Sequence, residues 1–178
     1  MIVKKNIIGI CGSASENSAN LSILKWMSGL EETNFNLEII DSLTDLPHFK
    51  TKLTEENTPN EIVILREKIT KADGIIICTP EYIFSLPSGL KNMLEWCVST
   101  TVFTDKPMIL VTASTMGIKG HTELKLIMET IQGKFTNETT LLIEGVKEKV
   151  DKTGNILDKN IEIQLLKLIE SFKGLLEL

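Results

Sequence analysis

The sequence predicts a three-layer α/β/α fold, in which helices cover both faces of a five-stranded parallel sheet of strand order 2-1-3-4-5. Two observations carry this prediction. Short apolar segments alternate along the chain with segments whose apolar residues recur at helical spacing. In addition, no internal repeat, low-complexity tract or linker divides the 178 residues. We therefore expect one domain over residues 1–178, with right-handed crossovers between the strands.

Five segments have the pattern of buried strands. Their apolar runs are short and end at polar or turn-forming residues, which suits parallel strands that are covered on both faces. The predicted strands cover residues 6–11, 35–40, 75–78, 106–113 and 139–143.

Five helices are predicted between and after these strands, each from apolar residues three and four positions apart. For the third helix, Ser85 is the expected N-cap, and Pro87 is acceptable in the first turn. The defining residues are Leu21, Leu24 and Met27; Ile62, Leu65, Ile69 and Ala72; Leu86, Leu90, Met93, Leu94 and Cys97; Leu124, Ile127, Met128 and Ile131; and Ile161, Leu165, Leu168, Ile169 and Phe172.

Composition argues against several classes of partner. The 19 basic and 24 acidic residues give a net charge of −5 without a basic run, which disfavours nucleic-acid and anionic-membrane binding. The chain shows no signal peptide and no apolar run of membrane-spanning length, so we expect a cytoplasmic protein. Cys11, Cys78 and Cys97 are widely spaced in apolar surroundings, so we expect reduced, buried thiols and no metal.

Residues 12–20, GSASENSAN, connect the first strand to the first helix. This loop contains five hydroxyl or amide side chains and only one charge. Backbone N–H groups, hydroxyls and the helix dipole together favour an anion such as phosphate. A simple N-cap at Ser18 or Asn20 is the alternative, although a cap requires one such residue rather than five. The loop lacks GxxxxGK[ST] and GxGxxG, which argues against a P-loop and a dinucleotide-binding fingerprint.

Two further loops, residues 80–85 and 114–120, are also rich in small and polar residues and follow the third and fourth strands. In a sheet of the predicted order, the loops after strands one, three and four converge on one rim, where ligands bind. We therefore expect one composite site. The polar connection over residues 41–60 is long enough that we expect it to cover part of the domain.

Three motifs resemble those of the NADPH-dependent FMN reductases, flavodoxin-like flavoproteins that include quinone, azo-dye and chromate reductases. Residues 12–20 are similar to the family's phosphate loop, GSxRxxSxN. Residues 79–96, TPEYIFSLPSGLKNMLEW, resemble its signature TPEYNxSxPGxLKNxxDW, and residues 106–120 are similar to its strand and glycine-rich loop. The resemblance implies a flavodoxin-like fold, FMN as cofactor and NADPH or NADH as co-substrate.

The resemblance also implies FMN contacts in all three loops. The first loop would hold the phosphate, the second would run beside the isoalloxazine ring, and the third would line the ring's other side. The candidate cofactor-binding residues are Ser13, Ser15, Ser18, Asn20 and the Leu21 backbone; Pro80, Glu81, Tyr82, Ile83 and Ser85; and Ser114, Thr115 and Gly117.

Ser88 stands where the second motif has Gly, which is a small change, and three further positions depart from the family pattern in ways that bear on the site. Ser15 stands where the motif has Arg, so no cation reaches the phosphate from that position. Ile83 replaces an Asn, which removes a side-chain donor, and Met116 replaces a glycine of the third loop.

We expect an FMN-dependent NAD(P)H oxidoreductase that passes electrons to a quinone, an azo compound, a metal oxyanion or a flavin. Because hydride transfer needs no acid or base from the protein, no catalytic residue is predicted. The alternative, motivated by Ser15 and Ile83, is a flavodoxin-like FMN carrier or a flavin-less binding module. By resemblance, a homodimer or homotetramer would form through the helix from Leu86 to Val98, with Lys91, Glu95 and Trp96 as candidate contacts.

Overall fold

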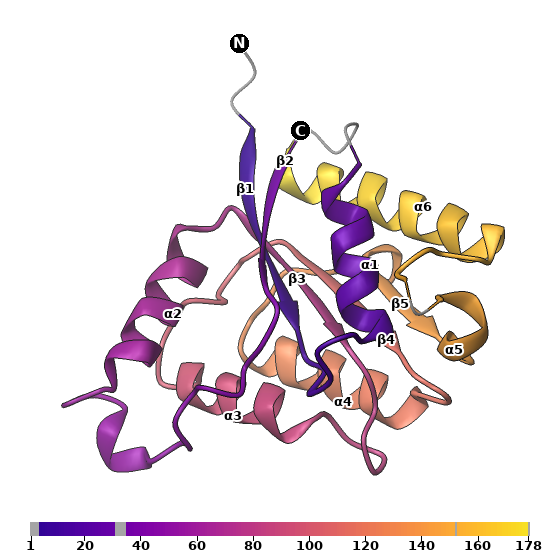
Figure 1. Cartoon of the computed structure of the whole chain (residues 1–178). Helices are drawn as coiled ribbons and strands as arrows, with labels where there is room; N and C mark the ends of the chain where they lie inside the picture. Colours follow the sequence, from indigo (N-terminus) through magenta and orange to yellow (C-terminus); the bar gives the residue numbers. More distant parts are fainter. Residues whose placement is uncertain (1–3, 31–34, 152, 178) are drawn as a thin grey trace.

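Five parallel strands form a sheet in the order β2-β1-β3-β4-β5, as predicted (Figure 1). The computed structural model describes residues 4–30, 35–151 and 153–177. The strands are β1 (Lys5–Cys11), β2 (Phe35–Ile40), β3 (Gly74–Thr79), β4 (Met108–Ala113) and β5 (Thr140–Ile143).

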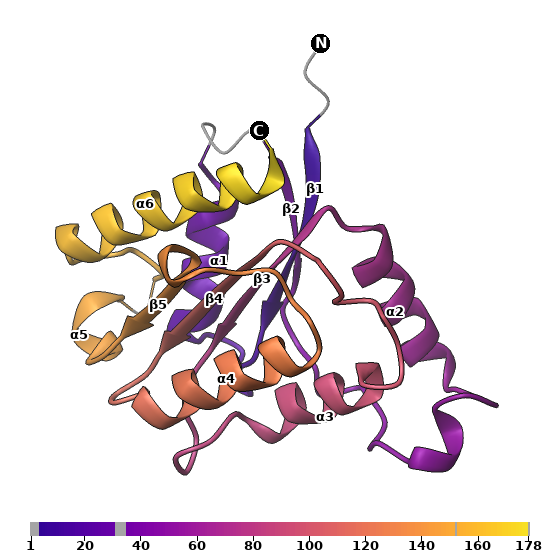
Figure 2. The same cartoon turned by 180° about the vertical axis from the view of Figure 1, so that it is seen from behind.

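Helices cover both faces of the sheet, which confirms the three-layer architecture. One layer contains α1 (Ala19–Ser28) and α6 (Lys159–Leu176), and the other contains α2 (Asn60–Lys71), α3 (Ser88–Cys97) and α4 (Ile118–Thr130) (Figures 1 and 2). Among the described residues, no helix is both long enough and apolar enough to cross a membrane.

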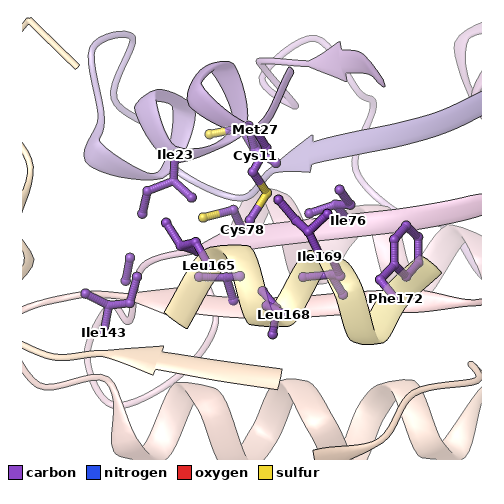
Figure 3. Close-up of a cluster of buried hydrophobic side chains, with 14 of the residues drawn as sticks. Cys11, Ile23, Met27, Ile76, Cys78, Ile143, Leu165, Leu168, Ile169 and Phe172 are labelled. Carbon is purple, nitrogen blue, oxygen red and sulfur yellow. The ribbon is translucent and has the colours of Figure 1, made fainter. Parts of the chain in front are cut away.

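The central strands alternate their side chains between two apolar cores. Ile76 and Cys78 face α1 and α6, whereas Ile75 and Ile77 face α2, α3 and α4. Figure 3 shows the first core, in which Leu165 and Ile169 of α6 meet the sheet. Because both faces of β3 are buried, its sequence is a continuous apolar run rather than an alternating one.

The start of α3 differs from the prediction. The helix begins at Ser88 with Pro87 at the N-cap position, and Ser85 lies outside it. Ser85 instead closes a tight hairpin with Tyr82, and its hydroxyl donates to Glu123 Oε2 at 2.6 Å. At α1, by contrast, Ser18 is the N-cap and accepts from the Leu21 N–H, which decides between the two predicted caps.

Three short elements were not predicted. They are the 3₁₀ turns η2 (Thr51–Leu53) and η3 (Asn137–Thr139), and the one-turn helix α5 (Val146–Lys149). None is long enough to show a helical repeat of apolar residues.

The long connection over residues 41–60 is fastened to α3. Trp96 Nε1 donates to the Pro47 carbonyl at 2.7 Å, and the Phe49 ring meets the Trp96 ring edge-on at 5.3 Å. Asn92 adds a hydrogen bond to the Pro47 carbonyl and accepts one from the Phe49 N–H. Trp96 is completely buried by these contacts. The prediction that Trp96 takes part in an oligomer contact is therefore wrong.

Candidate functional site

The carboxyl ends of β1, β3 and β4 lie in register. Cys11 pairs with Cys78, and Thr79 pairs with Thr112, so the three following loops leave the sheet at one rim. The loops surround a hollow of about 610 Å³, which is within the range of small-molecule sites. Its walls consist of Ser13, Ser15, Asn17, Ser18, Ala19, Asn20, Pro80, Glu81, Tyr82, Ala113, Ser114, Thr115, Val146, Lys147, Val150 and Asp151.

Gly12 starts the first loop at a place with no room for a side chain. A Cβ at this position would lie 2.4 Å from Thr79 Oγ1 and 2.9 Å from Leu90 Cδ2. The Gly12 N–H donates to the Cys78 carbonyl at 2.9 Å, which keeps the loop against β3. Beyond it, Ser13 Oγ accepts from the Ser15 N–H at 3.2 Å. The backbone of this loop is thus fixed close to the hollow.

Two polar residues of the first loop are buried and serve the fold as well as the site. Ser18 caps α1, and the Leu21 N–H donates to its hydroxyl at 3.1 Å. Asn20 donates from Nδ2 to the Ala113 carbonyl and accepts from the Cys78 thiol, so it joins α1 to the ends of β3 and β4. The Leu21 N–H, which was predicted to contact the phosphate, is therefore already engaged by the Ser18 hydroxyl.

The second loop forms a two-residue hairpin that projects from the rim. Tyr82 and Ser85 exchange two backbone hydrogen bonds, of 2.9 and 3.1 Å. Ile83 and Phe84 occupy the tip with φ of 51° and 60°, a conformation that β-branched and bulky residues rarely adopt. Ile83 is 95% exposed and Phe84 is 65% exposed. The Ile83 side chain is therefore in solvent and does not line the hollow.

Carboxylates fasten this hairpin to α4. Glu81 Oε2 accepts from the Gly120 N–H at 2.8 Å, while Glu123 accepts from the Ser85 hydroxyl, the Leu86 N–H and Lys91 Nζ. Partial burial by itself would raise the pKa of Glu123, but these three donors lower it below the usual value. The Glu123 carboxylate is consequently charged in the folded protein at neutral pH.

The third loop joins the hollow to α5. Ser114 and Thr115 line the wall, and their carbonyls accept from the N–H groups of Val146 and Gly145, each at 3.1 Å. Gly117 has φ of 94° and begins α4, at a point where a Cβ would lie 2.8 Å from Leu142 Cδ1. Gly117 shapes the loop from outside the hollow.

Nine of the thirteen predicted residues thus surround one hollow, and four do not line it: Leu21, Ile83, Ser85 and Gly117. Their contact with a cofactor stays a prediction. The lining residues that the prediction missed are Asn17, Ala19, Ala113, Val146, Lys147, Val150 and Asp151. Asn17 and Ala19 lie within the predicted phosphate loop. The last four belong to the α5 segment, for which the sequence gives no periodic signal.

Neither histidine lines this hollow. His121 Nδ1 lies 3.0 Å from Thr112 Oγ1; burial, and then the charge of Lys125, lowers the pKa of His121, so the ring is neutral at pH 7. His48 lines an adjoining hollow of about 330 Å³ between the 41–49 segment and the start of α3. A larger groove, of about 830 Å³, lies between α6 and β5, away from the rim where the three loops meet.

The sequence profile of the NADPH-dependent FMN reductases matches residues 5–147. The chain belongs to this family. The reductase is 29% identical to the NADH:(hydroxy)cinnamate reductase subunit CrdA of Vibrio ruber over 173 residues, which cover 94% of this chain and 85% of CrdA. It is 27% identical to the quinone reductase of Escherichia coli K12 over 169 residues, 89% of this chain and 88% of that enzyme.

Solved structures confirm the flavodoxin-like fold of the reductase. FerB of Paracoccus denitrificans, an NAD(P)H:(acceptor) oxidoreductase, superimposes with a TM-score of 0.72 at 19% identity, covering 97% of each chain. A flavodoxin from the domain Archaea gives a TM-score of 0.60 at 13% identity, covering 94% of this chain and 99% of that one. The expected class is also confirmed: the protein is an oxidoreductase with FMN as cofactor and a nicotinamide nucleotide as electron donor.

The groups around the hollow fit FMN. Ser13 and Ser15 supply hydroxyls, and the first turn of α1 supplies N–H groups that have no intrahelical acceptor. The absence of a side chain at Gly12 lets the start of this loop pack against Thr79 and Leu90. On the other side, Pro80, Glu81 and Tyr82 line the same hollow together with Ser114 and Thr115, and the Ser114 hydroxyl donates to the Glu81 carbonyl at 3.5 Å. The hollow thus combines hydroxyl and N–H donors from the first loop with a wall formed by the second and third loops.

Proposed function

We propose that the reductase holds FMN in this hollow, with the phosphate at residues 12–20 and the ring against residues 80–82 and 114–115. The observation that carries the proposal is the convergence of these three loops and the start of α1 on a single hollow of about 610 Å³. FMN bound there would supply the redox chemistry that links NADPH or NADH to the electron acceptor.

The residues of the chain bind and orient in this proposal. Ser13 and Ser15 donate to the phosphate, while Ser18 holds the first turn of α1 in place by capping it. The Glu81 carboxylate is held by the Gly120 N–H, which fixes the main chain that runs beside the ring. No side chain is required as acid or base.

The electron acceptor in this proposal is a small molecule of the quinone class, with azo compounds, metal oxyanions and free flavin as further candidates. The curated names of relatives support this choice, because they include quinone reductases and an NADH-dependent flavin reductase subunit.

The visible absorption spectrum of the protein, reconstituted with FMN and freed of excess, tests the proposal. Under anaerobic conditions, we expect NADPH or NADH to bleach the flavin band and a benzoquinone to restore it. Bound flavin that neither nucleotide bleaches would favour the carrier alternative. A protein that retains no flavin would contradict the proposed site.

We further propose that residues 1–178 act as one cytoplasmic domain that assembles as a homodimer or homotetramer through the helix from Leu86 to Val98. Val98 is 63% exposed at the end of α3, and Lys91 and Glu95 lie on the accessible side of the same helix. Light scattering should report a dimer or tetramer for the wild type. Val98→Asp should lower the apparent mass, and a monomeric wild type would refute the proposal.

A further inference from the structure

The proposed phosphate site has no positive charge in its own loop. Ser15 stands where the related motif has Arg, and the single charged residue of residues 12–20 is Glu16. Hydroxyl and N–H donors can hold a phosphate, but they carry no net charge, so they do not supply the Coulomb attraction that a cation gives to the phosphate. The charge that this loop lacks would have to come from another element.

Lys147 brings a cation to the same hollow from α5. Of the described residues that line the hollow, Lys147 alone is basic. The backbone around it is tied to the third loop, because Gly145 and Val146 donate to the carbonyls of Thr115 and Ser114. The position of Lys147 relative to the hollow is therefore set by main-chain hydrogen bonds.

The segment that carries Lys147 packs beside the first half of α1, the helix whose start belongs to the phosphate loop (Figure 1). Val146 and Val150 share an apolar core with Leu21. A Cβ on Gly154, just beyond α5, would lie 3.3 Å from the Ser22 hydroxyl. This packing places the segment that carries Lys147 at the α1 side of the hollow, where the dipole of α1 also favours an anion.

Lys147 is also free to act. Its side chain is exposed, and it forms no ion pair within residues 4–30, 35–151 and 153–177. The two acidic residues on the same wall are both engaged elsewhere. Glu81 accepts from the Gly120 N–H, and Asp151 accepts from the backbone and side chains of Thr153 and Asn155.

We propose that Lys147 is the cation that meets the FMN phosphate, in place of the arginine that is absent at position 15. This assignment rests on the proposed FMN site and names a binding residue outside the three motifs. The flexible four-carbon stem of a lysine suits this role, because it can bring an ammonium group to a phosphate from a neighbouring element.

The test compares the binding of FMN with that of riboflavin, which lacks the phosphate. Lys147→Met removes the charge and keeps an unbranched apolar stem, and Lys149→Met is the matched control on the same helix, outside the hollow. We expect Lys147→Met to weaken FMN binding about tenfold, with riboflavin binding unchanged within about twofold. Lys147→Arg should retain FMN affinity, and Lys149→Met should bind both flavins as the wild type does.

A second comparison uses Ser15→Arg, which returns the missing cation to the loop. We expect it to restore FMN affinity in the Lys147→Met background and to add less in the wild type, because the two cations would serve one phosphate. Added salt should weaken FMN binding more in the wild type than in Lys147→Met.

Three results would overturn the assignment of Lys147: an unchanged FMN affinity in Lys147→Met, an equal loss for FMN and riboflavin, or the same loss in Lys149→Met. In each of them the wild type still binds FMN, so the proposed function survives. A wild type that binds no FMN would overturn the proposed function itself, and the assignment with it.

Discussion

The loop at residues 12–20 and the hairpin at residues 80–86 border the same hollow but are held in different ways. The loop is fastened from within the fold: Ser18 and Asn20 are buried and hydrogen-bonded to α1 and to the end of β4. The hairpin is fastened from outside by the carboxylates of Glu81 and Glu123, and its tip projects into solvent.

This difference separates residues that the fold requires, in the first loop, from residues at the hairpin tip that the fold does not require. A buried polar group such as Asn20 cannot lose its partners without a cost to folding, so the first loop constrains the sequence strongly. The hairpin tip buries no polar group of this kind. Its two residues, Ile83 and Phe84, have positive φ, where a tight turn favours Asn, Asp or Gly.

The largest expected effect comes from Gly12→Ala in the first loop. The new Cβ would lie 2.4 Å from Thr79 Oγ1, so β3 or the loop must shift, and we expect the free energy of unfolding to fall by about 1–3 kcal/mol. Urea denaturation measures this. Gly174→Ala in α6 is the control, because a Cβ at that position would have no atom within 4 Å. Since alanine favours a helix more than glycine does, this change should raise the free energy of unfolding by about 0.5–1 kcal/mol. Equal stability of Gly12→Ala and wild type would show that the loop is not sterically fixed.

The next effect comes from Glu123→Gln, which weakens the support of the hairpin. We expect a loss of about 1–2 kcal/mol, because the charged acceptor of the Ser85 hydroxyl, the Leu86 N–H and Lys91 is removed. The pKa of Glu123 is lowered in the folded protein, so its contribution is complete above the ordinary pKa of 4.5 and is lost as the pH falls through the folded value.

Thermal unfolding as a function of pH measures this contribution. The gap between wild type and Glu123→Gln should therefore shrink in acid. The control is Glu129→Gln, an exposed residue of the same helix, which should follow the wild-type curve. A gap of constant size at every pH would show that the charge of Glu123 contributes nothing.

A smaller effect, of opposite sign, is expected at the tip of the hairpin. The double change Ile83→Asn and Phe84→Gly places residues that tolerate positive φ at both positions, and should stabilise the protein by about 1 kcal/mol. The melting temperature should rise by about 2–4 °C. Replacing both residues by Ser makes the tip equally polar without relieving the backbone. An equal rise in that variant would attribute the effect to apolar exposure instead of φ.

The smallest effect is expected where the two regions touch. The Tyr82 hydroxyl lies 3.3 Å from Ser13 Oγ, a long hydrogen bond between partly buried groups. Tyr82→Phe should cost about 0.5 kcal/mol or less in calorimetry, and should change FMN affinity by less than about threefold. Ser13→Ala removes the same bond together with a proposed phosphate donor. It should therefore weaken FMN more than Tyr82→Phe does, and equal affinities would argue against that donor.

The sequence was sufficient for the sheet and the main helices, because buried strands and amphipathic helices leave periodic patterns of apolar residues. It failed where a contact joins residues far apart in the chain. Ser85 has the sequence context of an N-cap, yet its partner is Glu123, 38 residues away. Lys147 lies on a helix of one turn, and only the tertiary structure brings it to the first loop.

The burial of the three cysteines affects how easily their thiols are oxidised. Cys11 and Cys78 lie side by side at the ends of β1 and β3, directly beneath the rim where the proposed cofactor would sit. Burial raises the pKa of all three thiols, that of Cys97 to about 12, so they remain protonated. Peroxide attacks thiolates rather than thiols. We therefore expect Cys11, Cys78 and Cys97 to resist oxidation by peroxide in the folded protein.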